Sequence, residues 1–138
     1  MKRYIILTAI LLSSWILPAQ TYKVIVNASN TTTTISKSDL SKHFLKKTKK
    51  WDNGDKIVPV DQSANSTVRK DFSTAIHNKS VSAIKSYWQQ YVFAGSGTPP
   101  MEKKSDDEVI EYVKSNTGAI GYVATGTNTA GVKEVTIN

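Results

Sequence analysis

The sequence predicts an α/β domain in which a mixed sheet is flanked by helices. β-Branched segments lie near both ends of the chain, and segments with a helical spacing of apolar residues lie between them. The helical segments follow Ser or Asn residues, which are common helix N-caps. Strands at both ends with helices between them favour one helix-covered sheet over an all-helical or an all-β fold.

Residues 1–20 have the pattern of a secretory signal peptide. Lys2 and Arg3 give a positively charged start, residues 4–12 form an apolar stretch, and Pro18 breaks any helix soon after it. The alternative is an uncleaved membrane anchor, although the apolar stretch is shorter than the ~20 residues that a spanning helix needs.

Cleavage is expected after Ala19 or Gln20, which leaves one domain of residues 21–138, periplasmic or secreted, with no stable membrane insertion. Loss of the two N-terminal basic residues lowers the formal net charge from +7 to +5. A basic chain favours anionic partners, although such a surface can also serve solubility alone. The absence of cysteine excludes disulfides, a thiol nucleophile, a Cys-based metal site and a lipid-anchoring cysteine.

The first half of the mature chain alternates strand and helix patterns. The predicted elements are a β-branched strand at residues 22–27, a Thr- and Asn-rich loop at 28–35, a helix opened by Ser36, an Asn-Gly turn at 52–55 and a strand at 57–60.

The second half contains three predicted helices followed by two strands. The helices start near Asn65 or Ser66, at Ser80 and at Ser105, and the strands cover residues 119–124 and 132–137. Gly118 is expected to stop the last helix because glycine readily adopts a left-handed conformation.

The segment of residues 61–72 carries the candidate ligand-binding residues. It follows a predicted strand and opens a predicted helix, whose first-turn N–H groups and positive dipole end attract anions. The polar residues at this turn are Ser63, Asn65, Ser66 and Thr67, with Arg69 just inside the helix. Hydroxyls beside a guanidinium suit an oxyanion such as phosphate. The alternative is that Ser63 or Asn65 only caps the helix and that Arg69 is solvated.

Two other features fit a binding site less well. The Gly95-Ser-Gly97 motif does not join a strand to a helix, as a dinucleotide site requires, so no nucleotide cofactor is expected. The lysines at residues 46–50 lie next to Trp51 and could bind nucleic acid, but a solvated helix end explains them, and no nucleic acid partner is expected.

The sequence contains no recognisable catalytic or metal-binding constellation. His43 and His77 lie in unrelated predicted helices, and neither a Gly-x-Ser-x-Gly nor a His-Glu-x-x-His motif is present. His77 lies near a helix C-terminus, where the dipole favours a protonated ring. We therefore expect no enzymatic activity, no metal and no cofactor.

Several segments together resemble a known family. They are residues 22–27, 35–40, 51–54, 57–60, 65–69, 87–88, 93–100 and 118–123. The strongest marks are Phe-Ala-Gly-Ser-Gly-Thr-Pro-Pro at 93–100 and Gly-Ala-Ile-Gly-Tyr-Val at 118–123. In this combination the chain is similar to phosphate ABC transporter substrate-binding proteins in their short PBP-like domain form. The resemblance implies a single lobe of the periplasmic-binding-protein type II fold.

The anion loop of that family matches this chain in part. The usual loop is Ser-Gly-Thr-Arg with a phenylalanine soon after it. The matching residues here are Ser66, Arg69 and Phe72. Thr67 replaces the glycine and Val68 replaces the threonine, which removes a close backbone approach and a hydroxyl. Gln62 stands where many relatives have an arginine.

The resemblance leads to two functional hypotheses. The first is an exported solute-binding protein, linked to ABC-type transport, that binds phosphate or a similar oxyanion through Ser66, Thr67 and Arg69, with Ser63 and Asn65 assisting. Because the chain corresponds to about one lobe, an ABC permease or a second copy would complete the cleft. The alternative is a non-catalytic interaction or accessory domain that keeps the fold and has lost the ligand.

Overall fold

The computed structural model describes residues 13–14 and 20–138. Almost all of the predicted signal peptide, residues 1–12 and 15–19, lies outside these described residues. Within the described part, no helix is long and apolar enough to cross a membrane.

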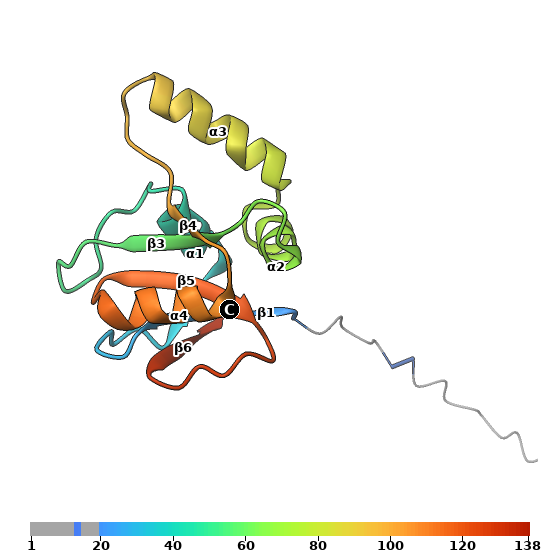
Figure 1. Ribbon diagram of the computed structural model, residues 1–138, viewed down its shortest axis with the longest axis vertical. Coiled ribbons are helices and arrows are strands. Elements are labelled where there is room, and N and C mark those ends of the chain that lie inside the picture. Colours follow the sequence, from blue (N-terminus) through green and yellow to red (C-terminus); the bar gives the residue numbers. More distant parts are fainter. Residues whose placement is uncertain (1–12, 15–19) are drawn as a thin grey trace, which may run out of the picture.

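Six strands form one mixed sheet in the order β2-β6-β1-β5-β3-β4 (Figure 1). The strands are β1 Tyr22–Asn27, β2 Thr34–Ile35, β3 Val58–Gln62, β4 Met101–Lys103, β5 Ala119–Ala124 and β6 Val132–Ile137. β1 runs antiparallel to both of its neighbours, β5 and β6. β3 runs parallel to β5 and to β4. The predicted α/β class with a mixed sheet is therefore confirmed.

The helices begin at serine caps, as the sequence predicts. They are α1 Lys37–Phe44, α2 Thr67–Phe72 with its continuation η1 Ser73–His77, α3 Val81–Phe93 and α4 Asp106–Ser115. Each hydroxyl accepts a hydrogen bond from the N–H three residues later, and the capping residues are Ser36, Ser66, Ser80 and Ser105. Of the two candidates for the start of α2, the cap is Ser66.

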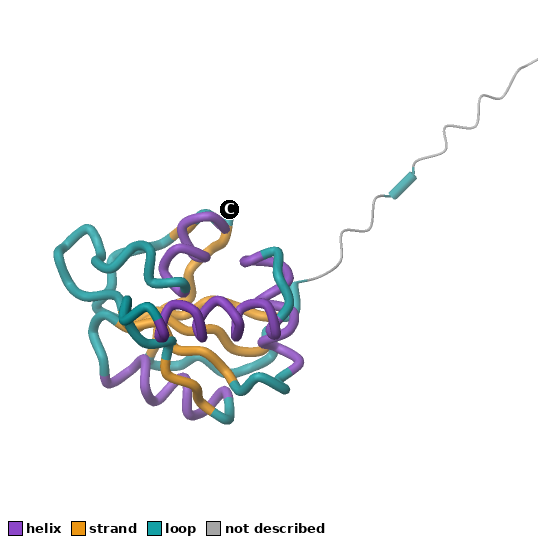
Figure 2. The backbone as a smooth tube through the Cα atoms, turned by 90° about the horizontal axis from the view of Figure 1, so that it is seen from above, coloured by secondary structure: helices purple, strands orange, loops and turns teal. Residues whose placement is uncertain are grey.

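Both faces of the sheet are covered by helices (Figure 2). On one face, Phe44 of α1 and Phe72 of α2 pack on the sheet, and the Phe72 ring stacks on Tyr122 with centroids 3.9 Å apart. On the other face, Val109 and Val113 of α4 belong to a second buried cluster. Because both faces are buried, β1 has a nearly continuous apolar sequence instead of an alternating one.

Helix α3 lies beyond the β4 edge of the sheet and covers neither face (Figure 1). Ile84 and Trp88 are buried against Leu45, the residue that follows α1. At the end of this helix, Phe93 is 95% exposed. The sheet edge and α3 therefore border a region where apolar side chains remain uncovered.

Three features of the sheet differ from the sequence prediction. β2 lies inside the predicted loop, because two residues are too few to show an alternating pattern. β4 has the sequence Met-Glu-Lys, which contains no alternating or β-branched pattern that would predict a strand. β3 continues to Gln62 because Asp61 and Gln62 are buried and hydrogen-bonded, which hydropathy does not reveal.

Gly118 follows α4 for a reason other than the predicted left-handed conformation. The glycines with positive φ are Gly54, Gly95, Gly97 and Gly131. A Cβ atom on Gly118 would lie 1.9 Å from the carbonyl oxygen of Lys56. Close backbone packing, and not turn geometry, therefore requires glycine at this position.

Candidate functional site

Strand β3 leads through a tight turn into the start of α2. The N–H of Ser63 donates to the carbonyl of Lys103 at 3.1 Å, which ties the turn to β4. The N–H of Ser66 then donates to the carbonyl of Ser63 at 2.9 Å. The Ser66 hydroxyl accepts from the N–H of Arg69 at 3.3 Å and caps the helix. This local geometry fixes the direction of the first-turn amides.

The four polar residues predicted at this turn lie together in the structure. Ser63 and Ser66 are half-buried, whereas Asn65 and Thr67 are exposed. The first turn of α2 contains no acidic residue, unlike the first turns of α1 and α4. The N–H groups of a first turn have no intrahelical acceptor. The start of α2 can therefore offer hydroxyls and amides to an anion from solvent.

Arg69 is buried and forms its contacts within the protein. Its Nη1 donates to the carboxylate of Glu102 at 2.6 Å and to the carbonyl of Gln62 at 2.8 Å. Its Nη2 lies 3.9 Å from the carboxylate of Asp61. Burial acts to lower the pKa of the guanidinium, but Asp61 and Glu102 outweigh it and raise that pKa. The positive charge of Arg69 is thus shared between two carboxylates.

Asp61 is the buried partner in this network. Its carboxylate accepts a hydrogen bond from the Tyr122 hydroxyl at 2.7 Å. Burial raises the pKa of Asp61, while the nearby guanidinium of Arg69 acts in the opposite direction. Burial also raises the pKa of Tyr122, so its hydroxyl remains a donor at neutral pH.

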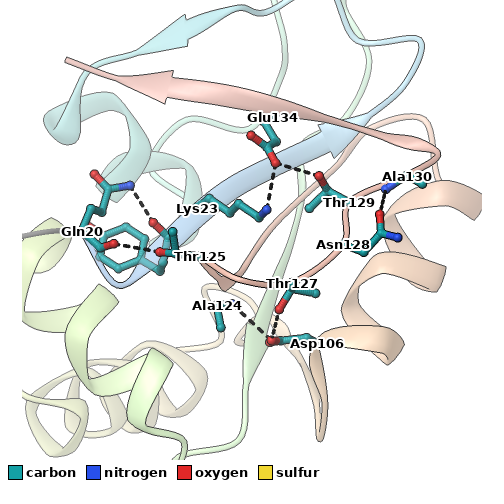
Figure 3. Close-up of polar contacts among 11 residues, drawn as sticks. Gln20, Lys23, Asp106, Ala124, Thr125, Thr127, Asn128, Thr129, Ala130 and Glu134 are labelled. Carbon is teal, nitrogen blue, oxygen red and sulfur yellow. Dashed lines mark hydrogen bonds and ion pairs between the residues drawn. The ribbon is translucent and has the colours of Figure 1, made fainter.

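Gln62 connects the helix start to α4. Its side-chain oxygen accepts from the Ser66 hydroxyl at 2.9 Å, and its side-chain nitrogen donates to Asp106 at 2.7 Å. Asp106 also accepts from the Thr127 hydroxyl at 2.7 Å and from the N–H of Ala124 (Figure 3). The side chain of Gln62, which stands where many relatives have an arginine, is therefore held beside Ser66 by its own hydrogen bonds.

A pocket of about 480 Å³ lies between α3 and the β3–β4 edge. Its polar lining includes Asp61, Arg69 and Glu102, and its apolar lining includes Trp88 and Phe93. The lining includes none of the four turn residues, Ser63, Asn65, Ser66 and Thr67. The structure thus brings these four together at the helix start, while the Arg69 guanidinium borders the pocket below α3.

Sequence reasoning did not identify Asp61 and Glu102 as members of this network. An acidic residue at the end of an apolar strand is an available signal for Asp61, because a buried carboxylate needs a partner. No comparable signal exists for Glu102, whose position depends on the unpredicted strand β4.

The two histidines take part in packing. Nδ1 of His77 lies 2.8 Å from the Ser41 hydroxyl, and its ring packs edge-on against Phe72. Burial, together with the charges of Arg69 and Lys47, lowers the pKa of His77 to about 4. The ring is therefore neutral at neutral pH, and the predicted helix-dipole explanation, which needs a protonated ring, is wrong.

Comparisons with known proteins place the fold. Neither a protein-family profile nor a curated protein sequence matches the chain. An ABC-type phosphate transport receptor from Vibrio cholerae has a similar structure, with a TM-score of 0.68 and 19% identity over 85% of this chain and 46% of that chain. A putative phosphate ABC transporter substrate-binding protein from Clostridium perfringens, solved with bound phosphate, gives a TM-score of 0.68 and 16% identity over 85% and 44%. A possible phosphate binding protein from Planctomyces limnophilus DSM 3776 gives a TM-score of 0.65 and 20% identity over 86% and 41%.

This chain spans less than half of the length of each of these three structures. The resemblance inferred from the sequence is confirmed at the level of the fold. The chain has the fold of one part of the phosphate ABC transporter substrate-binding proteins.

Proposed function

We propose that this protein is an exported solute-binding protein that binds phosphate or a similar oxyanion at the start of α2. The observation that carries the proposal is the Ser66-capped first turn of α2. This turn follows β3 directly, has the hydroxyl residues Ser63 and Thr67 on either side of its cap in the sequence, and contains no carboxylate. The amides of Thr67 and Val68 would supply most of the binding, with the Ser63, Asn65 and Thr67 side chains assisting.

The charges around the turn limit the expected affinity. Arg69 is the cation that the sequence predicts for this site, but its guanidinium contacts Asp61 and Glu102 and lines the pocket beside α3. Asp106 adds a further carboxylate, which contacts the turn through Gln62. An anion at the start of α2 would be bound mainly by the dipoles of the backbone amides. We therefore expect a dissociation constant near 1 mM, which corresponds to a binding free energy of roughly −4 kcal/mol.

The similar structures described above include an ABC-type phosphate transport receptor and a putative phosphate ABC transporter substrate-binding protein, and both are longer than this chain. By analogy, we propose a periplasmic or secreted protein that works with an ABC permease. A second body, either that permease or a second copy, would cover the anion and exclude water, which strengthens charge-assisted hydrogen bonds.

Calorimetric titration of phosphate into the Thr67→Glu variant tests the anion site. A carboxylate in the first turn interacts favourably with the positive end of the helix dipole and stabilises the helix. The variant should therefore fold at least as well as the wild type. The same carboxylate occupies the amides and repels phosphate, and we expect a loss of affinity at this site of at least tenfold.

The matched control is Thr67→Gln, which has the same shape without the charge. It should keep the affinity within about threefold, since the amides remain free. Equal affinity in the Glu and Gln variants would exclude an anion at this turn. Arg69→Ala is a poorer test, because its loss leaves Asp61 buried without its cation.

A second candidate function, protein interaction, is favoured by the apolar face below α3. Phe93 is 95% exposed and lines the pocket together with Trp88 and Pro100. A projecting side chain next to a hollow on the same face is self-complementary under two-fold symmetry. The occupant we infer is a second copy of the chain, with each Phe93 inserted into the other pocket.

Sedimentation of the wild type against Phe93→Asp tests this alternative. A dimer with Phe93 at its centre should dissociate at least tenfold more readily in the variant. Gln90→Asp adds the same charge to the same helix outside the pocket lining and should leave the dimer intact. A wild type that stays monomeric at high micromolar concentration would exclude the alternative.

A further inference from the structure

A second, smaller pocket lies between the lysine-rich segment that follows α1 and the loop that follows α3. Its volume is about 230 Å³. Its lining includes the three lysines Lys46, Lys49 and Lys56, and the hydroxyl residues Tyr91, Ser96 and Thr98. Sequence reasoning treated the lysine run and the Gly-Ser-Gly loop as separate features, and the fold brings them to one place.

The backbone holds the three lysines in a defined arrangement. Lys46, the second residue after the end of α1, has a φ of 56°, so the chain turns sharply there. The N–H of Ile57 donates to the carbonyl of Lys49 at 2.9 Å, and Lys50 pairs with Lys56 in an antiparallel bridge. Lys49 and Lys56 are therefore held on neighbouring backbone segments of a hairpin.

The opposite wall is a tight turn at the end of α3. The N–H of Ser96 donates to the carbonyl of Tyr91 at 3.0 Å. Gly97 has a φ of 147°, and a Cβ there would lie 3.1 Å from the Tyr91 ring. The turn thus places Ser96 and Thr98 in the lining of the pocket that also contains the lysines.

The positive charges in this pocket have no internal counterion. Within residues 20–138, none of Lys46, Lys49 and Lys56 forms an ion pair, and no carboxylate is among the residues that line the pocket. Burial and the charge of Lys56 lower the pKa of Lys46. Like charges held together in this way are relieved when an anion binds between them.

Nucleic acid is a poor match for this cluster. Trp51, the aromatic residue next to the lysine run, is buried and donates its indole N–H to the carbonyl of Gly118 at 2.9 Å. It is therefore not available to stack on a base. A compact oxyanion needs only charge and hydroxyl donors, which the pocket provides.

We propose that this pocket is a second oxyanion site, in which Lys46, Lys49 and Lys56 neutralise a phosphate- or sulfate-like group and the hydroxyls of Ser96 and Thr98 donate hydrogen bonds to it. The site goes beyond the proposed function, because it shares no residue with the start of α2. Its ligand is either a free anion or the head group of an anionic lipid.

The test uses two triple variants in the Thr67→Glu background, where the site at α2 is closed. One variant replaces the pocket lysines by glutamine (Lys46→Gln, Lys49→Gln, Lys56→Gln). The control replaces three exposed lysines that do not line the pocket (Lys42→Gln, Lys47→Gln, Lys50→Gln) and removes the same charge. Calorimetry with inorganic phosphate and sedimentation with phosphatidylglycerol vesicles separate the two sources of ligand.

Saturable binding of phosphate or of the vesicles should fall at least tenfold in the pocket variant and less than threefold in the control. Whichever probe binds identifies the source. Equal losses in the two variants would show diffuse attraction by net charge and overturn the site. No binding of either probe before the lysines are replaced would overturn it as well, and neither result bears on the α2 site.

Discussion

Gly118 supports the fold by allowing two backbone segments to meet. Its carbonyl accepts hydrogen bonds from the Trp51 indole and from the N–H of Val58, both at 2.9 Å. The missing side chain lets the carbonyl of Lys56 approach from the other side. One residue thus joins β3, β5 and the hairpin that precedes β3.

Gly118→Ala should lower the free energy of unfolding by about 1–3 kcal/mol, because the new methyl group meets backbone that cannot move aside. Urea denaturation followed by tryptophan fluorescence measures the change. Gly126→Ala is the control, since no atom lies within 4 Å of its added Cβ, and it should stay within about 0.5 kcal/mol. Similar effects at both positions would contradict the packing account.

His77 makes the stability of the protein depend on pH. Its pKa is about 4 in the folded state against 6.5 in its ordinary state, so the unfolded chain binds a proton more readily. The neutral His77 therefore contributes fully to the stability of the folded state above pH 6.5. This contribution to the free energy of unfolding is lost as the pH falls from 6.5 toward 4. Between pH 7 and pH 5 the loss should reach about 1–2 kcal/mol.

The His77→Gln variant should be less sensitive to acid by that amount, because glutamine can bind Ser41 and does not titrate. Chemical denaturation of both proteins at pH 7 and pH 5 gives the comparison. His43, whose pKa is lowered by burial, is present in both proteins and cancels. Parallel pH profiles would show that His77 is not responsible.

At the scale of elements, Arg69 of α2 connects the ends of β3 and β4. Arg69 contacts Gln62 and Asp61 on β3 and Glu102 on β4. Because the Asp61 carboxylate is buried, it depends on this cation and on the Tyr122 hydroxyl. The position of the α2 start is thus tied to the sheet edge.

Arg69→Met should destabilise the protein by about 3–5 kcal/mol at pH 7, since it leaves a buried carboxylate without its partner. Thermal and urea unfolding report the loss. Lys70→Met removes the same charge from the next residue, which is exposed, and should cost less than about 0.5 kcal/mol. A cost below 1 kcal/mol for Arg69→Met would mean that the network does not hold the turn.

Sequence patterns predicted the longer elements and failed where long-range pairing decides the structure. The serine caps and the apolar spacing in α3 and α4 are local signals, and both are confirmed. β4 could not be predicted, because its polar residues form a strand only through pairing with β3. Likewise, the turn residues Ser63 and Ser66 are local, whereas the carboxylates around Arg69 come from distant segments.

At the scale of the whole molecule, the chain corresponds to less than half of the phosphate receptors that share its fold. Helices α2 and α3 both lie near the β3–β4 side of the sheet (Figure 1). The residues Asn65 and Thr67 at the α2 start are exposed, and the apolar pocket is lined by residues of α3 and of the β3–β4 edge. A second body at this edge could cover either region. If the second body covers the anion at the α2 start, as the proposed function requires, phosphate should promote its association with this chain.

Amide chemical shifts during a phosphate titration test the central proposal most directly, because they locate the anion residue by residue. We expect saturable shifts of the Thr67 and Val68 amides with a midpoint near 1 mM, which Thr67→Glu removes and Thr67→Gln keeps. The amides of Val81 and Ser82, at the Ser80-capped start of α3, should not move with the same midpoint. Shifts that do not saturate at the start of α2, or that match those at α3, would contradict a built anion site.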